Sequence, residues 1–106
     1  EWFTGGWDLL LTATQSMPPP RIGEITSTRE EPLRAFLRAA PYGVNTLPFN
    51  QSGMPAVSLP VHWTADGLPV GAQLVAPFAR EDLLLAVGAQ LEQIVDWRSR
   101  RPPLHA

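Results

Sequence analysis

The sequence contains neither lysine nor cysteine, and each absence excludes a class of chemistry. All eight basic residues are arginine, so this chain alone cannot complete a mechanism that needs a lysine base or a lysine Schiff base. Without cysteine it forms no disulfide and no thiolate metal site. The two histidines, His62 and His105, are far apart in sequence. We therefore expect no metal site and no cofactor.

Charged residues and long apolar runs are also scarce. Charged residues make up 17% of the chain and the net charge is −2, whereas an average soluble domain has about 25% charged residues. There is no basic cluster of the kind that binds nucleic acid, and no apolar run approaches the roughly 20 residues of a membrane span. We expect neither partner. With no signal peptide in view, we expect a cytoplasmic protein.

The low charge, combined with 44% hydrophobic residues, predicts that part of the surface packs against more protein. The chain begins Glu1-Trp2-Phe3 rather than with methionine. This start resembles the end of a structural element, so we expect a piece of a longer chain.

Proline punctuates the first half of the sequence, which has 12 prolines overall. Residues 1–4 predict the last turn of a helix ended by Gly5-Gly6, and residues 7–12 predict a strand buried on both faces, with a short helix as the alternative. Residues 13–28 predict a loop, because Pro18-Pro19-Pro20 lack N–H groups and have a fixed φ. Those prolines are more typical of a rigid connector than of a polyproline ligand.

A short helix should follow this loop. Thr28 to Glu31 have the spacing of a capping box, and Pro41 should end the helix. Four apolar residues between them fall on one helical face, namely Leu33, Phe36, Leu37 and Ala40. Residues 42–47 predict a loop, and residues 49–52 predict one helical turn ended by Gly53.

The second half predicts a β-hairpin over about residues 56–76 and a helix over about residues 80–95. Asp66-Gly67 supplies the turn, and Val61 to Thr64 extend the first strand. Five apolar residues form one stripe along the helix, namely Leu84, Val87, Leu91, Ile94 and Val95. Gly88 suggests that this helix packs closely on a sheet. Residues 96–106 predict a solvated polar tail.

No residue of this chain is assigned a catalytic role. Ser58 and His62 would lie about 13 Å apart along an extended strand, too far for a nucleophile and its base. Ser52 has no adjacent base, Asp66 is explained by its turn, and the Asn50-Gln51-Ser52 glycosylation pattern lacks a secretory signal. The arginines of the tail are too few for a nucleic-acid footprint.

Three blocks in order and spacing carry a family resemblance. They are Phe49-Asn50-x-x-Gly53-x-Pro55-Ala56, then Asp66-Gly67-Leu68-Pro69-Val70-Gly71-x-Gln73-Leu74-Val75, then Glu81 leading Leu84 in a helix. Residues 7–14 add a strand ending in a Thr-x-Thr turn. The pattern resembles the C-terminal end of the amidase signature family, although Ala13 replaces the usual proline and Met54 replaces the common Gln or His. The ending over residues 97–103 resembles bacterial members near the 6-aminohexanoate-cyclic-dimer hydrolases.

The resemblance implies a fold and an activity. The fold class is α/β: residues 1–106 would be the C-terminal fragment of a single amidase signature domain, a mixed β-sheet covered by helices. The family hydrolyses linear carboxamides through an acyl-enzyme, with a serine nucleophile, a second serine on a cis peptide and a lysine base. Those residues would lie outside this chain, so the chain alone is expected to be inactive.

The resemblance also suggests where substrate would contact this chain. The family's acyl pocket is partly lined by the loop before the Phe-Asn-x-x-Gly block, which corresponds here to Val44, Thr46 and Leu47. Simple loop packing is an equally good explanation for each, and Asn50 would cap or brace the next turn. The expected partners are a small-molecule amide and the remainder of the amidase chain, with a homodimer left open.

Two alternatives remain for the whole protein. One is the A-type subunit of a glutamyl-tRNA amidotransferase, which would pair with a B-type chain. The other is a non-catalytic truncated chain or interaction module, which the missing lysine and the low charge favour.

Overall fold

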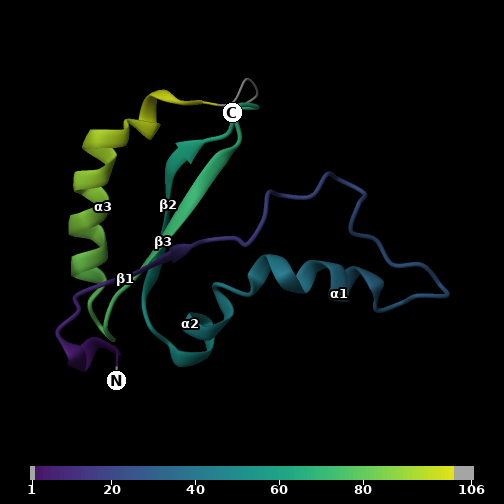
Figure 1. Cartoon of the computed structure of the whole chain (residues 1–106), viewed down its shortest axis with the longest axis horizontal. Coiled ribbons are helices and arrows are strands. Elements are labelled where there is room, and N and C mark those ends of the chain that lie inside the picture. Colours follow the sequence, from purple (N-terminus) through teal and green to yellow (C-terminus); the bar gives the residue numbers. More distant parts are fainter. Residues whose placement is uncertain (1, 102–106) are drawn as a thin grey trace.

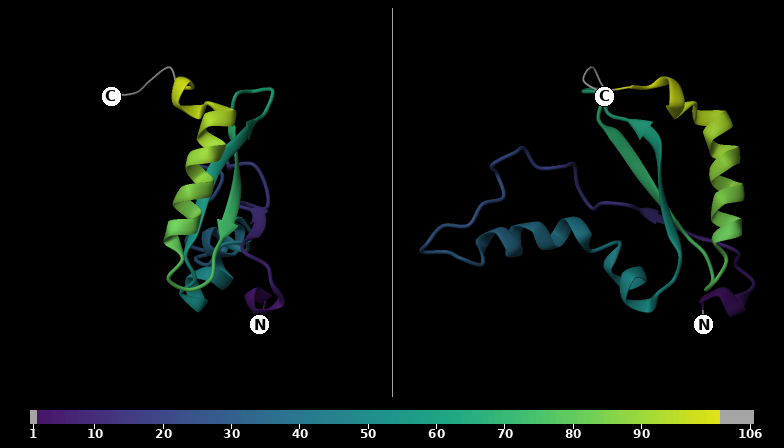
Figure 2. Two further views of the ribbon diagram at one scale, coloured as in Figure 1. Left: turned by 90° about the vertical axis from the view of Figure 1, so that its left-hand side faces the viewer. Right: turned by 180° about the vertical axis from the view of Figure 1, so that it is seen from behind.

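The computed structural model describes residues 2–101 and consists of two parts that differ in compactness (Figure 1). We call residues 14–55 the arm and residues 56–95 the hairpin–helix unit; residues 2–13 precede the arm and residues 96–101 follow the unit. The elements in chain order are η1 Trp2–Gly5, β1 Leu10–Ala13, α1 Arg34–Ala39, η2 Ala40–Gly43, α2 Leu47–Ser52, β2 Ala56–Trp63, β3 Pro69–Val75, α3 Glu81–Val95 and η3 Trp97–Ser99. Seen from behind, α1 and the loop leading into it extend to one side, away from α3 (Figure 2).

The strands form a three-stranded antiparallel sheet in the order β1-β3-β2. The predicted hairpin is confirmed, because β2 and β3 pair from Ala56 opposite Val75 to Trp63 opposite Pro69. The register shifts between Pro60 and His62, so a bulge accommodates a proline that cannot donate to the ladder. Together with the helices, the sheet confirms the α/β prediction, and every pairing among the described strands is antiparallel.

The core lies between this sheet and α3. The predicted helix is confirmed, and its Leu84 packs with Leu74 and Ala76, flanked by half-buried residues of β2 and α3. Leu74 lies opposite both Leu11 of β1 and Val57 of β2, so α3 covers one face of the sheet. Within the predicted stripe only Ile94 was wrong, because it is 78% exposed, whereas Val95 is half-buried.

β1 corrects the prediction of a strand buried on both faces. It begins at Leu10 rather than Trp7, and its residues alternate between half-buried and exposed. Leu11 is 66% exposed on the face that α3 covers elsewhere. β1 is an edge strand that α3 does not cover, so only β3 shields it from solvent. The apolar run in the sequence does not show that the strand lies at an edge.

α1 is shorter than predicted and begins differently. The Glu31 N–H donates to Thr28 Oγ1 over 3.0 Å, as a capping box requires, but the helix starts only at Arg34. Ser27 caps one N–H group of its first turn, because Ser27 Oγ accepts from the Ala35 N–H over 3.2 Å. Pro32 separates the two motifs and delays the helix.

α2 begins earlier than predicted and ends where predicted. Leu47 is its first residue rather than the end of a loop, with Pro48 in the first turn, where a missing N–H costs nothing. Gly53 ends it with φ of 69°, in the left-handed region that suits glycine. Asn50, predicted to cap or brace the following turn, is exposed and joins the helix through its backbone N–H, which donates to the Thr46 carbonyl.

The segment after α3 was predicted as a solvated polar tail; residues 98–101 are exposed as predicted, but the segment also contacts the rest of the chain. Arg98 Nε donates to Glu92 Oε1 over 2.7 Å, and the Arg100 guanidinium lies 4.2 Å from the centre of the Trp63 ring. The tail therefore folds back on the hairpin, beside an exposed His62. Glu1, Pro102-Pro103 and His105 lie outside the described residues.

Candidate functional site

The three residues predicted to contact substrate lie where η2 passes into α2. Val44 follows η2 directly and is 53% exposed, while Leu47 opens α2 and is 54% exposed. Thr46 between them is half-buried, and its hydroxyl donates to the Gly43 carbonyl over 3.1 Å. Two apolar side chains thus stand open to solvent on a turn whose backbone is hydrogen-bonded. We call residues 44–47 the connection.

Gln73 of β3 ties this connection to the sheet. Its side chain is only 4% exposed, and it is the buried polar residue of the described part of the chain. Gln73 Nε2 donates to Thr12 Oγ1 over 3.0 Å and to the Asn45 carbonyl over 3.1 Å. Sequence reasoning gave Gln73 no role beyond the family pattern. The available signal was a lone amide within the apolar strand from Val70 to Ala76.

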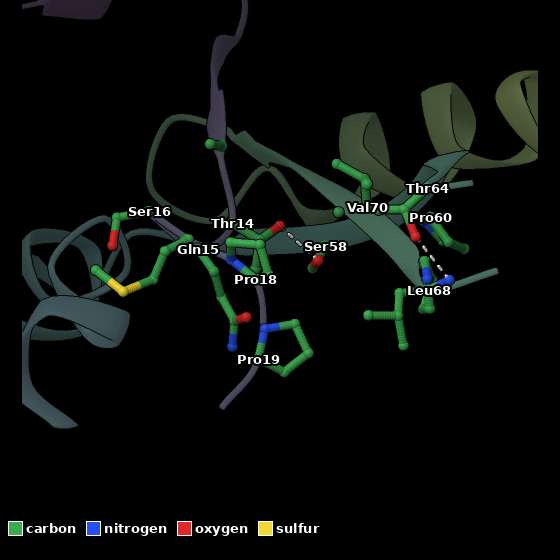
Figure 3. A pocket seen from close by; sticks show the side chains of 14 residues that line it. Thr14, Gln15, Ser16, Pro18, Pro19, Ser58, Pro60, Thr64, Leu68 and Val70 are labelled. Carbon is green, nitrogen blue, oxygen red and sulfur yellow. Dashed lines mark hydrogen bonds between the residues drawn. The ribbon is translucent and has the colours of Figure 1, made fainter. Parts of the chain in front are cut away.

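A hollow of about 510 Å³ opens beside this tie, between the arm and the hairpin (Figure 3). None of its lining residues carries a charge; they are Ala13, Thr14, Gln15, Ser16, Met17, Pro18, Pro19, Ser58, Pro60, Thr64, Leu68, Pro69, Val70 and Gly71. Hydroxyl and amide groups alternate with proline rings and aliphatic side chains. A surface of this kind suits an uncharged ligand, because no ion in the lining is available to pair with a charged one.

A pair of hydroxyls crosses the sheet at this hollow. Thr14 Oγ1 lies 2.7 Å from Ser58 Oγ (Figure 3). The Thr14 N–H donates to the Gly71 carbonyl over 3.1 Å. A Cβ on Gly71 would lie 2.7 Å from Thr14 Oγ1 and 2.8 Å from Ser58 Oγ. The two hydroxyls therefore have room for their hydrogen bond only because residue 71 is glycine. The Ser58 hydroxyl is thus engaged with Thr14, which agrees with our rejection of a Ser58–His62 nucleophile.

The hollow and the connection are neighbours but not one surface. Ser16 on the rim of the hollow donates from Oγ to the Pro41 carbonyl of η2 over 2.6 Å. Val44, Thr46 and Leu47 are not among the residues that line the hollow. The structure therefore brings the three predicted residues together, near the hollow, without placing them in it.

The charged groups lie elsewhere, on exposed surfaces. Arg80 donates to both carboxylate oxygens of Asp82, over 2.8 and 3.1 Å, and this hydrogen bonding holds the pKa of Asp82 below its usual range. Within residues 2–101 no three His, Asp or Glu side chains are grouped closely enough to hold a metal ion. None of the helices in that range is both long and apolar enough to cross a membrane.

Comparison with known proteins places this geometry in a family. A family model described as Amidase matches residues 2–85. The chain is 44% identical over 109 aligned residues to the 6-aminohexanoate-cyclic-dimer hydrolase of Paenarthrobacter ureafaciens, covering 98% of this chain and 22% of that protein. It is 40% identical over 97 residues to the A-type subunit of the glutamyl-tRNA(Gln) amidotransferase from Synechococcus sp. (strain JA-2-3B'a(2-13)), covering 92% of this chain and 17% of that protein.

The fold agrees with these matches. A solved structure of 6-aminohexanoate cyclic dimer hydrolase complexed with substrate superposes on 96% of this chain with a TM-score of 0.88, at 42% identity. The superposed part is 22% of that structure's chain. The present chain thus spans about a fifth of the length of these relatives, and the resemblance inferred from the three sequence blocks is confirmed.

Proposed function

Because this chain belongs to the amidase family, we propose that it is the C-terminal part of an amidase that hydrolyses linear carboxamide C–N bonds. In this proposal residues 1–106 form one end of a single domain, and the acyl-enzyme chemistry is performed by residues outside them. The chain has no lysine to act as the base, and the only described partner of the Ser58 hydroxyl is the Thr14 hydroxyl. What it contributes is a surface that contacts substrate.

The observation that carries this role is the uncharged character of the surface near the connection. Val44 and Leu47 expose apolar side chains, which suit the aliphatic part of an amide. The neighbouring hollow is lined by hydroxyl, amide, proline and aliphatic groups without a charge. Hydroxyls can both donate to an amide carbonyl and accept from an amide N–H, so the two surfaces together favour an uncharged amide as substrate.

The names of two relatives indicate two kinds of substrate. One is a hydrolase of 6-aminohexanoate cyclic dimer, and the other is a subunit of a glutamyl-tRNA(Gln) amidotransferase. The uncharged hollow favours the first kind of substrate for this chain. The exposed apolar residues of the arm favour the remainder of an amidase domain as its main partner. They would equally serve a non-catalytic interaction module, and the following experiment distinguishes the two.

The test is a hybrid enzyme. The matching segment of the Paenarthrobacter ureafaciens relative is replaced by this chain, and release of amine from a panel of uncharged linear and cyclic amides is measured. We expect turnover within about a hundredfold of the parent enzyme, because the reacting groups are unchanged and only their supporting wall differs. A folded hybrid without turnover would contradict the proposal.

Two controls accompany the hybrid. The 106-residue chain alone should hydrolyse none of these amides, and any turnover that survives removal of contaminating amidases would show that chemistry resides in it. Leu47→Asp in the hybrid should lower kcat/KM about tenfold or more, since a carboxylate would replace an apolar contact with substrate. Gln90→Asp, at an exposed polar position of α3 outside the arm, should leave kcat/KM nearly unchanged.

A further inference from the structure

We infer that Gln73 is a positioning residue, which holds the substrate-contacting connection at a fixed height above the sheet. This inference rests on the proposed function, because it assumes that residues 44–47 contact the amide. Gln73 itself is buried and touches no substrate. It acts through the backbone of Asn45, which lies between Val44 and Thr46 in the chain.

The hydrogen bonds of Gln73 join three segments that are distant in sequence. Its Nε2 donates to Thr12 in β1, 61 residues away, and to Asn45, 28 residues away. The orientation of the amide follows from chemistry, since the Asn45 carbonyl only accepts and must therefore face the NH₂ group. Both hydrogens of that group are used, so the amide cannot turn without breaking one of the two bonds.

Packing cannot provide the same restraint. Val44 and Leu47 are each more than half exposed, so neither side chain anchors the connection by burial. The Thr46 hydroxyl donates to the Gly43 carbonyl, and the Thr46 carbonyl accepts from N–H groups of α2, so neither group reaches the sheet. Among the hydrogen bonds of the described residues, the Gln73–Asn45 bond links residues 44–47 to the sheet. Because Gln73 is only 4% exposed, this bond is shielded from competing water.

The enzymatic test uses the hybrid with Gln73→Met, which keeps the size of the side chain and removes its donors. We expect KM for uncharged amides to rise about tenfold with kcat changed less than about twofold, because a displaced wall weakens binding while the reacting groups stay in place. Gln90→Met, at an exposed position on α3, is the matched control and should change neither constant. A purely structural role would lower the active fraction and leave KM unchanged, which would overturn the inference.

A second measurement does not depend on activity. Amide hydrogen exchange on the 106-residue chain should become at least about tenfold faster across residues 44–50 in Gln73→Met, while exchange in α3 stays the same. Thr12→Val removes one acceptor and keeps the Asn45 bond, so it should leave exchange in residues 44–50 within about twofold of the parent. Unchanged exchange in Gln73→Met would refute the tie itself.

The two measurements separate the possible failures. An inactive hybrid carrying the native Gln73 would contradict the proposed function, and the exchange experiment would still decide whether Gln73 restrains the connection. An active hybrid in which Gln73→Met leaves KM and exchange unchanged would contradict only the positioning role.

Discussion

The arm and the hairpin–helix unit contain similar apolar residues, yet only one of them has a core. Every described residue that is fully buried belongs to the hairpin–helix unit, within the short span from Gln73 to Leu84. No described residue of the arm reaches that state. The difference teaches that in this chain a hydrophobic pattern indicates which side chains need burial but not whether their partners lie in the same 106 residues.

α1 shows this most clearly. Its predicted apolar face is present, but Phe36 is 72% exposed and its neighbours Leu33 and Leu37 are similarly open. α3 has a stripe of the same kind, and there β2 and β3 supply the opposing surface. We therefore regard the arm as folded by its prolines and its hydrogen bonds, including those of Thr14 and Asn45 to β3, and the hairpin–helix unit as folded by burial.

The sharpest way to break this comparison is to truncate one apolar residue in each part. Leu84→Ala should destabilise the chain by about 3 kcal/mol, because it removes buried methyl groups and leaves a cavity beneath α3. Phe36→Ala should change the free energy of unfolding by less than about 0.5 kcal/mol, as is usual for an exposed position. Urea unfolding followed by far-UV circular dichroism measures both.

The same pair of substitutions extends to the hybrid enzyme. If the remainder of an amidase domain covers α1, Phe36→Ala should cost about 3 kcal/mol there, as for a core residue. Equal, small effects of Phe36→Ala in the isolated chain and in the hybrid would show that the arm stays open in both. A large effect in the isolated chain would contradict the division into two parts.

The seam between the two parts is tested at Gly71. Gly71→Ala should destabilise the chain by about 1–3 kcal/mol, because the new methyl group would collide with the Thr14 and Ser58 hydroxyls. In a Thr14→Ala, Ser58→Ala background the same substitution should cost far less. Thermal unfolding of the four variants measures this coupling, and a cost that persists without the hydroxyls would place its cause in the backbone instead.

Much of the hairpin–helix unit could be predicted from sequence, because its determinants are local. The Asp66-Gly67 turn, the flanking strands and the acidic first turn of α3 each follow from neighbouring residues, and the structure confirms them. Gly53 likewise ended α2 as its permissive backbone predicted. Leu11 and Ile94 were misjudged because exposure depends on which segment lies opposite, information that the periodicity of a single strand or helix does not contain.

The candidate site was less predictable for the same reason. Val44, Thr46 and Leu47 came from a family resemblance, and nothing in their own chemistry marks them. The Gln73 tie joins residues 61 and 28 positions apart, and the hydroxyl pair joins residues 44 apart. Such contacts arise only when the chain folds, so no motif of adjacent residues announces them. The stacking of Arg100 on Trp63 was missed likewise.

Within the hairpin–helix unit, a substitution at Gly88 tests how closely α3 packs against β2. A Cβ at this position would lie 3.8 Å from both Leu59 methyl carbons, at ordinary contact distance. Gly88→Ala should therefore stabilise the chain by up to about 1 kcal/mol, through higher helix propensity and one added contact. The expectation is checked by a rise in the urea midpoint at unchanged slope; a fall would show that α3 and β2 approach more closely than this spacing allows.

The smallest expected effect concerns the Arg80–Asp82 ion pair, because we expect charge to contribute less than burial to the free energy of unfolding. Because the hydrogen bonds from Arg80 lower the pKa of the Asp82 carboxyl, folding favours its ionised form. The stabilisation is present above the carboxyl's unfolded pKa and is lost as the pH falls through the lower folded value. Asp82→Asn should thus be slightly less stable than the parent at neutral pH, and the two should converge in strong acid. Arg80→Gln should weaken the same pH dependence, because the backbone N–H of Leu83 still favours the ionised carboxyl. Urea midpoints collected from neutral to strongly acidic pH decide the matter, and a difference between parent and Asp82→Asn that widens in acid would reverse the sign of the linkage and contradict the assignment.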